Sequence, residues 1–290
     1  MDCLNLKIKK DDNIIVVGSG IVAVDCIKLL RDLVSGNIYV FEKQINNMSI
    51  LKLQVSTLSN VHYDIIDEEI EMKILKLNAS LIFSINNIFL FRDKIIDTHC
   101  IINYHNSLLP KHPGRNAESW CIYEDDEYSG ITWHIVERKV DKGKIIYQEA
   151  VKLNKEMTPI KLLKLQNNIA IKSFIKIIND IFNKQQLKLY EKKKIKNIKF
   201  HFSKERPNNG FLNILWNAEQ ISRFLRAMDY GFLYTLGRPK VYLDNVIFTF
   251  DKYKIEKCDI IEPYENVYRE NNNIIIKKGK YIFKLIGVKE

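Results

Sequence analysis

The chain has 290 residues and a mass of 34.2 kDa, enough for one large domain or for a medium and a small domain. Hydrophobic residues make up 46% and charged residues 28%, as in folded globular proteins. Residues 1–13 are polar, and the longest apolar run, residues 14–30, is broken by Gly18, Gly20 and Asp25. We therefore expect neither a secretory signal peptide nor a membrane span.

The net charge of +10 raises nucleic-acid binding as a hypothesis. Lysine is spread along the chain together with many asparagine and isoleucine residues, which is typical of a compositional bias of the whole genome. The one dense basic run, residues 191–199, is interpreted as a solvated linker. The cysteines form no Cys-x-x-Cys pair, so we expect reduced thiols in a cytoplasmic protein. They are Cys3, Cys26, Cys100, Cys121 and Cys258.

Strand-like and helical patterns alternate in the first half of the chain. Residues 13–17 form a β-branched run, a glycine-rich turn follows, and residues 21–33 have helical spacing. Strands that alternate with helices predict a doubly wound, mostly parallel α/β sheet, whose ligands lie beyond the carboxyl ends of the strands. The other elements expected here are a helix at 69–77 and strands at 37–41, 58–63, 80–85 and 100–104.

The second half opens with a long helix. Thr158 is expected as its N-cap, Pro159 occupies the first helical position, and helical spacing continues to about residue 182. Asn217 with Gln220 resembles a capping box at the start of a short helix. Further strands are expected at 241–243, 246–250, 274–277 and 281–286.

These patterns predict two domains. Residues 1–183 form the α/β domain, and residues 184–209 form a polar linker with one embedded strand. Residues 210–290 form a small α+β domain rich in strands.

The candidate chemistry lies around the strand at 100–104. Asn103 and His105 are two residues apart and therefore lie on one face of an extended strand. Asp141 follows in a polar loop beside Gly143. This set of side chains suits acyl transfer. The amide can hold a carbonyl oxygen, the imidazole can move a proton, and the carboxylate can tune the imidazole as a base.

Other motifs allow other functions. Residues 18–23, Gly-Ser-Gly-Ile-Val-Ala, fit the dinucleotide fingerprint, and Glu42 lies where a ribose-binding acid is expected. Glycine at this turn also permits close packing, so an NAD-binding oxidoreductase is the less favoured alternative. His134 alternates with apolar neighbours, and both a place in the site and a packing role stay open. The histidines lack metal-ligand spacing, and we expect no metal.

Three motifs carry a resemblance. Asn-x-His-x-Ser-Leu-Leu-Pro at 103–110, Gly-Ile-Thr at 130–132 and Val-Asp-x-Gly at 140–143 resemble the folate-dependent formyltransferases, whose catalytic domain is Rossmann-like. The resemblance covers residues 14–181 well and residues 210–287 more loosely. It implies transfer of a formyl group from 10-formyltetrahydrofolate to a primary amine, through a tetrahedral intermediate and without metal.

The resemblance also implies roles for individual residues. Asn103 and His105 would hold the oxyanion, His105 would assist the proton that leaves the amine, and Asp141 would orient and tune His105. Two loops would supply backbone groups and apolar walls to the pterin ring. By position, these folate-binding residues are Ile88, Phe89, Leu90, Val136, Glu137, Lys139 and Val140.

The acceptor is less defined. Residues 111–123 depart from the arginine-rich loop of methionyl-tRNA formyltransferases. Residues 131–134, Ile-Thr-Trp-His, are similar to members that act on amino sugars or on aminoacyl groups held by peptide synthetases. We expect a small or carrier-bound amine (an amino sugar nucleotide, an amino acid or an aminoacyl group), with methionyl-tRNA as the alternative. The formyl hydrolases of the family carry an N-terminal regulatory domain that we do not recognise in these residues, so we do not expect the hydrolase activity. The oligomeric state is open, a homodimer included.

Overall fold

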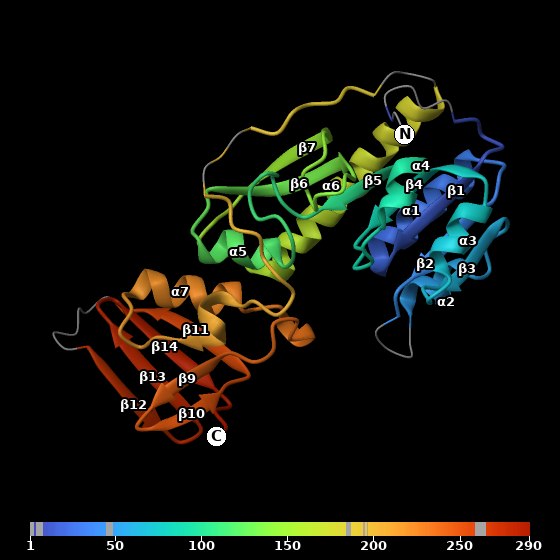
Figure 1. Ribbon diagram of the computed structural model, residues 1–290. Coiled ribbons are helices and arrows are strands. Elements are labelled where there is room, and N and C mark those ends of the chain that lie inside the picture. The colour runs from blue at the N-terminus through green and yellow to red at the C-terminus, as the bar shows by residue number, and fades with distance from the viewer. Residues whose placement is uncertain are drawn as a thin grey trace. The chain divides into compact units, whose positions relative to one another are not determined.

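The computed structural model (Figure 1) shows an α/β sheet and a strand-rich C-terminal part. Residues 184–186, 194 and 196 of the predicted linker and most of the first seven residues lie outside the described residues. The structure describes residues 3, 8–44, 49–183, 187–193, 195, 197–258 and 265–290.

The chain divides into two compact units that are interleaved in sequence. The first unit contains residues 1–113, 130–151 and 165–199, and the second contains residues 114–129, 152–164 and 200–290. The second unit takes in an early segment because Ser119 Oγ donates to the carbonyl of Ala227 over 2.7 Å, and the Tyr230 hydroxyl donates to Glu118 over 2.8 Å. The predicted domains, 1–183 and 210–290 with a linker at 184–209, stay a prediction.

A seven-stranded sheet organises the first unit, in the order β3-β2-β1-β4-β5-β6-β7. The pairs from β3 through β5 are parallel, and β5 pairs with β6 in antiparallel orientation. The predicted mostly parallel α/β sheet is therefore confirmed. The strands are β1 Asn13–Gly18, β2 Ile38–Glu42, β3 Val61–Ile65, β4 Ala79–Ile85, β5 Cys100–His105, β6 Tyr128–Ile135 and β7 Ile145–Lys152.

The sheet is buried on both faces, so its central strands are continuously apolar. Val16 and Phe83 belong to one core cluster, whereas their neighbours Ile15 and Ile82 belong to another, and all four are fully buried. The predicted helices at 21–33, 69–77 and 159–182 are present as α1, α3 and α6. The helices are α1 Gly20–Leu33, α2 Ile50–Val55, α3 Ile70–Lys76, α4 Asp93–Thr98, α5 Ala117–Tyr123 and α6 Pro159–Phe182.

The glycine-rich turn between β1 and α1 is explained by packing. A Cβ atom on Gly18 would overlap the carbonyl oxygen of Ile85, and the Ser19 amide donates to the same oxygen over 3.1 Å. The carboxylate of Glu42, the residue considered for ribose binding, accepts hydrogen bonds from Ser49 and from the Tyr63 hydroxyl. Close packing therefore accounts for this turn without a dinucleotide.

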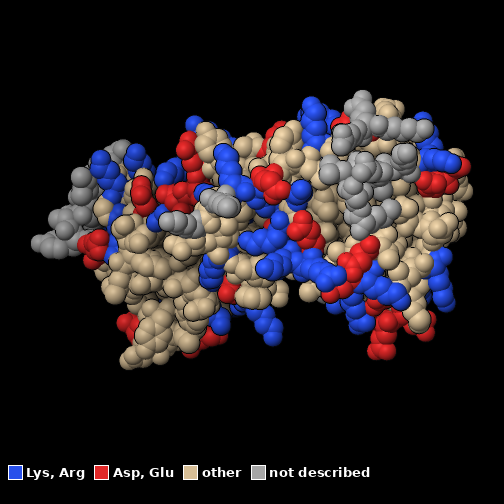
Figure 2. All heavy atoms as spheres, turned by 45° about the horizontal axis from the view of Figure 1, so that its top comes forward, with Lys and Arg blue, Asp and Glu red and all other residues tan. Residues whose placement is uncertain are grey.

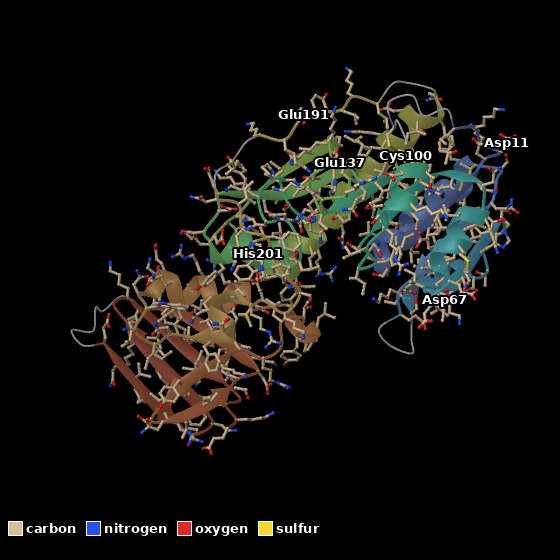
Figure 3. The ribbon with its side chains drawn as sticks, in the orientation of Figure 1. Asp11, Asp67, Cys100, Glu137, Glu191 and His201 are labelled. Carbon is tan, nitrogen blue, oxygen red and sulfur yellow. A yellow bond between two sulfur atoms is a disulfide. The ribbon has the colours of Figure 1, made fainter. Side chains whose placement is uncertain are left out.

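Cys3 and Cys100 form a disulfide, with a Cα–Cα distance of 5.3 Å (Figure 3). The prediction of reduced thiols is wrong for this pair. The two residues are 97 positions apart, and only the fold brings the N-terminal segment against the start of β5. Cys26, Cys121 and Cys258 are free thiols.

The second unit contains one capped helix and two sheets. In helix α7, Ala218–Ala227, Asn217 and Gln220 form the predicted capping box. The sheets have the orders β10-β9-β8 and β11-β14-β13-β12, so the expected strand-rich part is present. Strands β11 and β12 were not predicted because few of their residues are apolar. The strands are β8 Phe211–Leu212, β9 Lys240–Leu243, β10 Val246–Thr249, β11 Lys252–Lys257, β12 Asn266–Glu270, β13 Asn273–Lys278 and β14 Tyr281–Ile286.

The strand expected inside the linker is not found among the described residues of 184–209. Isolated bridges occur there instead, one of which pairs Tyr190 with Ile145. In the part of the chain that the structure describes, no helix combines the length and the apolar character needed to cross a bilayer.

Candidate active site

The structure brings together the three predicted catalytic residues at one end of the sheet. Asn103 and His105 end β5, and Asp141 lies in the loop that joins β6 to β7. The Nδ1 atom of His105 is 3.9 Å from Oδ2 of Asp141, and both side chains are buried. An imidazole and a carboxylate that are distant in sequence thus face each other.

Strand register adds two polar neighbours to this group. Asn103 lies opposite Ser84 on β4 and opposite His134 on β6. Ser84 Oγ donates to Asn103 Oδ1 over 2.7 Å, and Asn103 Nδ2 lies 3.0 Å from His134 Nε2. The amide of Asn103 is therefore held from both sides.

The tautomer of His134 follows from its contacts. Its Nδ1 lies 2.8 Å from the carbonyl oxygen of Ile135 and donates to it, so Nε2 accepts from Asn103 in the neutral ring. Burial lowers the pKa of His134, although the hydrogen bond and charge of Asp141 act in the opposite direction. One hydrogen on Asn103 Nδ2 is taken by His134, and the second can serve a ligand.

His105 is fixed by a carbonyl group. Its Nε2 lies 3.0 Å from the carbonyl oxygen of His112 and therefore donates to it. In the neutral ring Nδ1 then keeps its lone pair, and 3.9 Å to Asp141 is too long for a hydrogen bond. His105 can take up a proton at Nδ1, on the side of the carboxylate.

The Ser-Leu-Leu-Pro motif holds the loop that presents the His112 carbonyl. Thr132 Oγ1 donates to the carbonyl of Ser107 over 2.6 Å and accepts the amide of Leu109 over 3.1 Å. Gln148 Nε2 donates to the carbonyl of Leu109 over 2.9 Å. The motif therefore acts through backbone geometry, because it fixes the carbonyl group that binds His105.

The last position of Val-Asp-x-Gly has no room for a side chain. A Cβ atom on Gly143 would overlap the carbonyl oxygen of Ile135, so the loop crosses close to the end of β6. Asp141 itself has a φ of 54°, in the left-handed region. Its Oδ1 lies 3.4 Å from His134 Nε2, which makes the carboxylate a neighbour of both histidines.

The first predicted folate loop, Ile88 to Leu90, follows β4. Asn87 braces it, because Asn87 Oδ1 accepts the Phe89 amide over 2.7 Å and Nδ2 donates to the Phe89 carbonyl over 2.9 Å. Nδ2 also lies 3.3 Å from Ser84 Oγ. Ile88 and Phe89 are half-buried, whereas the side chain of Leu90 is 71% exposed. The loop thus offers apolar surface and is connected through Asn87 and Ser84 to the amide of Asn103.

The second predicted folate loop follows β6 and ends on Asp141. Val136 is half-buried and packs in the same core cluster as Phe89. Glu137, Lys139 and Val140 are exposed, and Figure 3 labels Glu137 on this loop. Contact of either loop with folate stays a prediction.

Sequence reasoning missed Ser84, Asn87 and Lys192 and left His134 open. Lys192 Nζ donates to the main-chain carbonyl of Asp141 over 2.7 Å. Burial lowers the pKa of Lys192 to about 8, against the charges of Asp141 and Glu137. The interpretation of residues 191–199 as a solvated linker is therefore wrong for Lys192. Periodic alternation could have placed Ser84 and His134 on strands, but not in register with Asn103.

Comparisons with known proteins identify the family of the chain. The Formyl transferase family profile matches residues 34–178, half of the chain. The GDP-perosamine N-formyltransferase of Brucella melitensis biotype 1 is 27% identical over 129 residues, which are 44% of this chain and 47% of that protein. This match spans about half the length of the relative. A methionyl-tRNA formyltransferase of Borreliella afzelii is 25% identical over 252 residues, 83% of this chain and 76% of that protein.

A solved structure has the same fold. The N-formyltransferase from Helicobacter canadensis, in complex with folinic acid and dTDP-3-aminofucose, superimposes with a TM-score of 0.71 at 15% identity. The comparison covers 95% of this chain and 99% of that chain. With the family profile over half of its residues, this chain belongs to the formyl transferase family.

Proposed function

We propose that this protein is an N-formyltransferase that moves a formyl group from 10-formyltetrahydrofolate to a primary amine. The observation that carries the proposal is the cluster at the end of β5, in which Asn103, His105 and Asp141 meet. An oriented amide next to a proton acceptor suits acyl transfer and little else. Two relatives, a GDP-perosamine N-formyltransferase and a methionyl-tRNA formyltransferase, support the same reaction class.

Each residue has a defined part in this reaction. The amine nitrogen bonds to the formyl carbon while the bond from that carbon to the donor nitrogen breaks, and negative charge develops on the formyl oxygen. The second hydrogen of Asn103 Nδ2 donates to this oxygen. His105 Nδ1 takes the proton that leaves the amine, and a proton returned to the donor nitrogen completes the balance.

Asp141 and a carbonyl group support the charged form of His105. Once Nδ1 is protonated, the imidazolium faces the carboxylate of Asp141, and its Nε2 hydrogen stays bonded to the carbonyl oxygen of His112. The ring therefore keeps its hydrogen bond to the His112 carbonyl throughout the proton transfer. The 3.9 Å separation in the ligand-free protein is expected to shorten when substrates bind.

The donor is proposed to lie against the two loops at 88–90 and 136–140. Leu90 and Val140 are exposed apolar side chains on these loops, at 71% and 43% exposure. An apolar ring with polar edges, such as a reduced pterin, fits such walls. When bound, the folate supplies the formyl carbon.

A small or carrier-bound amine is the proposed acceptor, with an amino sugar nucleotide first. Within residues 111–123, the six residues Ala117 to Ile122 are buried, and Trp120 stacks on His201 with ring centroids 4.2 Å apart. A tRNA contact needs exposed basic side chains, of which this segment has Lys111 and Arg115. On the face in Figure 2, Lys and Arg side chains lie among Asp and Glu side chains. Methionyl-tRNA remains the second candidate, because the match to a methionyl-tRNA formyltransferase covers 83% of this chain.

Folate binding is the first test. Calorimetry is expected to detect saturable binding of 5-formyltetrahydrofolate and no binding of NADH. Leu90→Asp is expected to weaken folate binding roughly tenfold or more, because a buried leucine contact contributes about 1.5–3 kcal/mol. Leu53→Asp is the matched control, since Leu53 is 75% exposed on α2.

Two outcomes would contradict this assignment. Tight NADH binding without folate binding would favour an oxidoreductase instead of a formyltransferase. Equal folate affinity of the Leu90 and Leu53 variants would remove the loop at 88–90 from the donor site.

The acceptor is tested by direct comparison. Formyl transfer is measured with GDP-perosamine, dTDP-3-aminofucose, free amino acids, aminoacyl carrier proteins and charged initiator tRNA. We expect turnover with a small or carrier-bound amine that changes little between 50 and 200 mM salt. Turnover of the tRNA alone, falling steeply with salt, would reverse the order of the two candidates.

A further inference from the structure

Lys192 reaches the candidate site from outside the part of the chain that matches the family, which ends at residue 178. Its path is defined by strand-like pairing. The amide of Tyr190 donates to the carbonyl of Ile145 and the amide of Ile145 to the carbonyl of Tyr190, each over 2.8 Å. Leu187 is buried in the main core cluster. The segment after α6 is therefore held against the start of β7, next to the loop of Asp141.

We infer that Lys192 is a positioning residue, whose ammonium group holds the main chain at Asp141 and thereby the carboxylate that faces His105 and His134. The contact is the 2.7 Å hydrogen bond from Lys192 Nζ to the Asp141 carbonyl oxygen. This inference rests on the proposed function, because it assigns Lys192 to the same site.

The backbone conformation of Asp141 explains why the hydrogen bond from Lys192 matters. Asp141 has a φ of 54°, in the left-handed region, which aspartate adopts more readily than most residues and which hydrogen bonds to the turn stabilise. The turn is closed by the amide of Lys142, which donates to the carbonyl of Lys139 over 3.2 Å. The carbonyl of Asp141 points to Lys192, so one ammonium group stabilises the turn and orients the residue that carries the carboxylate.

The charges around Lys192 make its influence measurable. The carboxylates of Asp141 and Glu137 face it from the β6–β7 loop, Glu191 is its neighbour in sequence (Figure 3), and Lys142 opposes it. Around Asp141 lie His105 from β5 and His134 from β6. The positive charge of Lys192 acts on His134 and opposes its protonation, whereas Asp141 favours protonation.

The test is a titration of His134 by nuclear magnetic resonance in the complete, ligand-free protein, with His134→Gln used to assign the signal. Lys192→Met keeps the aliphatic stem and removes the charge. It is expected to raise the titration midpoint of His134 by roughly half a pH unit or more, because a cation that opposes protonation is gone. Lys192→Arg keeps the charge and is expected to titrate as the wild type does. Lys193→Met, at an exposed neighbouring position, is the matched control.

Turnover gives an independent reading. Lys192→Met is expected to lower kcat roughly tenfold with an unchanged KM for the folate, and Lys192→Arg to restore most of the rate. Because the pKa of Lys192 is lowered to about 8, the ratio of wild-type to Lys192→Arg turnover is expected to fall above that pH.

The outcomes separate the inference from the proposed function. If Lys192→Met matches Lys193→Met in the His134 titration and in turnover, the positioning role is refuted. If the wild type transfers formyl to no amine, the proposed function fails, and the His134 titration still decides whether Lys192 acts on this cluster. A shifted His134 midpoint in Lys192→Met alone supports the contact.

Discussion

His105→Ala is expected to lower kcat by roughly a hundredfold to ten-thousandfold, the range of general acid–base catalysis. The imidazole of His105 keeps a lone pair at Nδ1, while its Nε2 donates to the His112 carbonyl. Without it, the attacking amine loses its proton acceptor, and the charge of Asp141 has no imidazolium to stabilise. Stopped assays of formyl transfer with saturating donor and acceptor measure the loss.

Fold and binding controls keep this result interpretable. His105 lies at the end of β5 with 8% of its surface exposed, so its removal leaves a cavity, and the thermal unfolding of the variant is compared with that of the wild type. His62→Ala is the matched control, because His62 is an exposed strand residue that stacks on Tyr39. Both variants are expected to bind 5-formyltetrahydrofolate as the wild type does. Near-normal turnover of a folded His105→Ala protein would refute its role as proton acceptor.

Asn103→Ala is expected to lower kcat by about a hundredfold to a thousandfold, the usual loss for one oxyanion donor. The side chain is suited to that role because its Oδ1 is occupied by Ser84 and one Nδ2 hydrogen by His134, which aims the second hydrogen. A donor aimed in advance stabilises charge that develops in the transition state without reorganising. The measurement is kcat at saturating concentrations of both substrates.

A graded pair separates contact from orientation. Ser84→Ala leaves the amide of Asn103 in place but removes the donor to Oδ1, so it is expected to lower kcat only about tenfold. Ser56→Ala is its control, since Ser56 is exposed at the end of α2 and donates to a main-chain carbonyl. A larger loss in Ser84→Ala than in Asn103→Ala would contradict the assignment of the amide as the donor.

The amino-acid sequence by itself predicted several elements and singled out Asn103, His105 and Asp141 as one candidate set. The β-branched run at β1, the helical spacing of α6 and the capping box of Asn217 are local patterns, and each element is present. Asn103 and His105 are two residues apart on a strand, so their shared face follows from the extended backbone. Asp141 was identified by its motif, and the structure places it beside His105.

The tertiary structure alone decided which side chains surround that set. Ser84 and His134 meet Asn103 through strand register, which depends on pairing between distant segments. The disulfide of Cys3 with Cys100 and the contact of Lys192 with Asp141 join segments far apart in the chain. Periodicity reports how a segment is buried but not what it is buried against. The groups that aim the amide and hold the Asp141 turn therefore became visible only once the chain was folded.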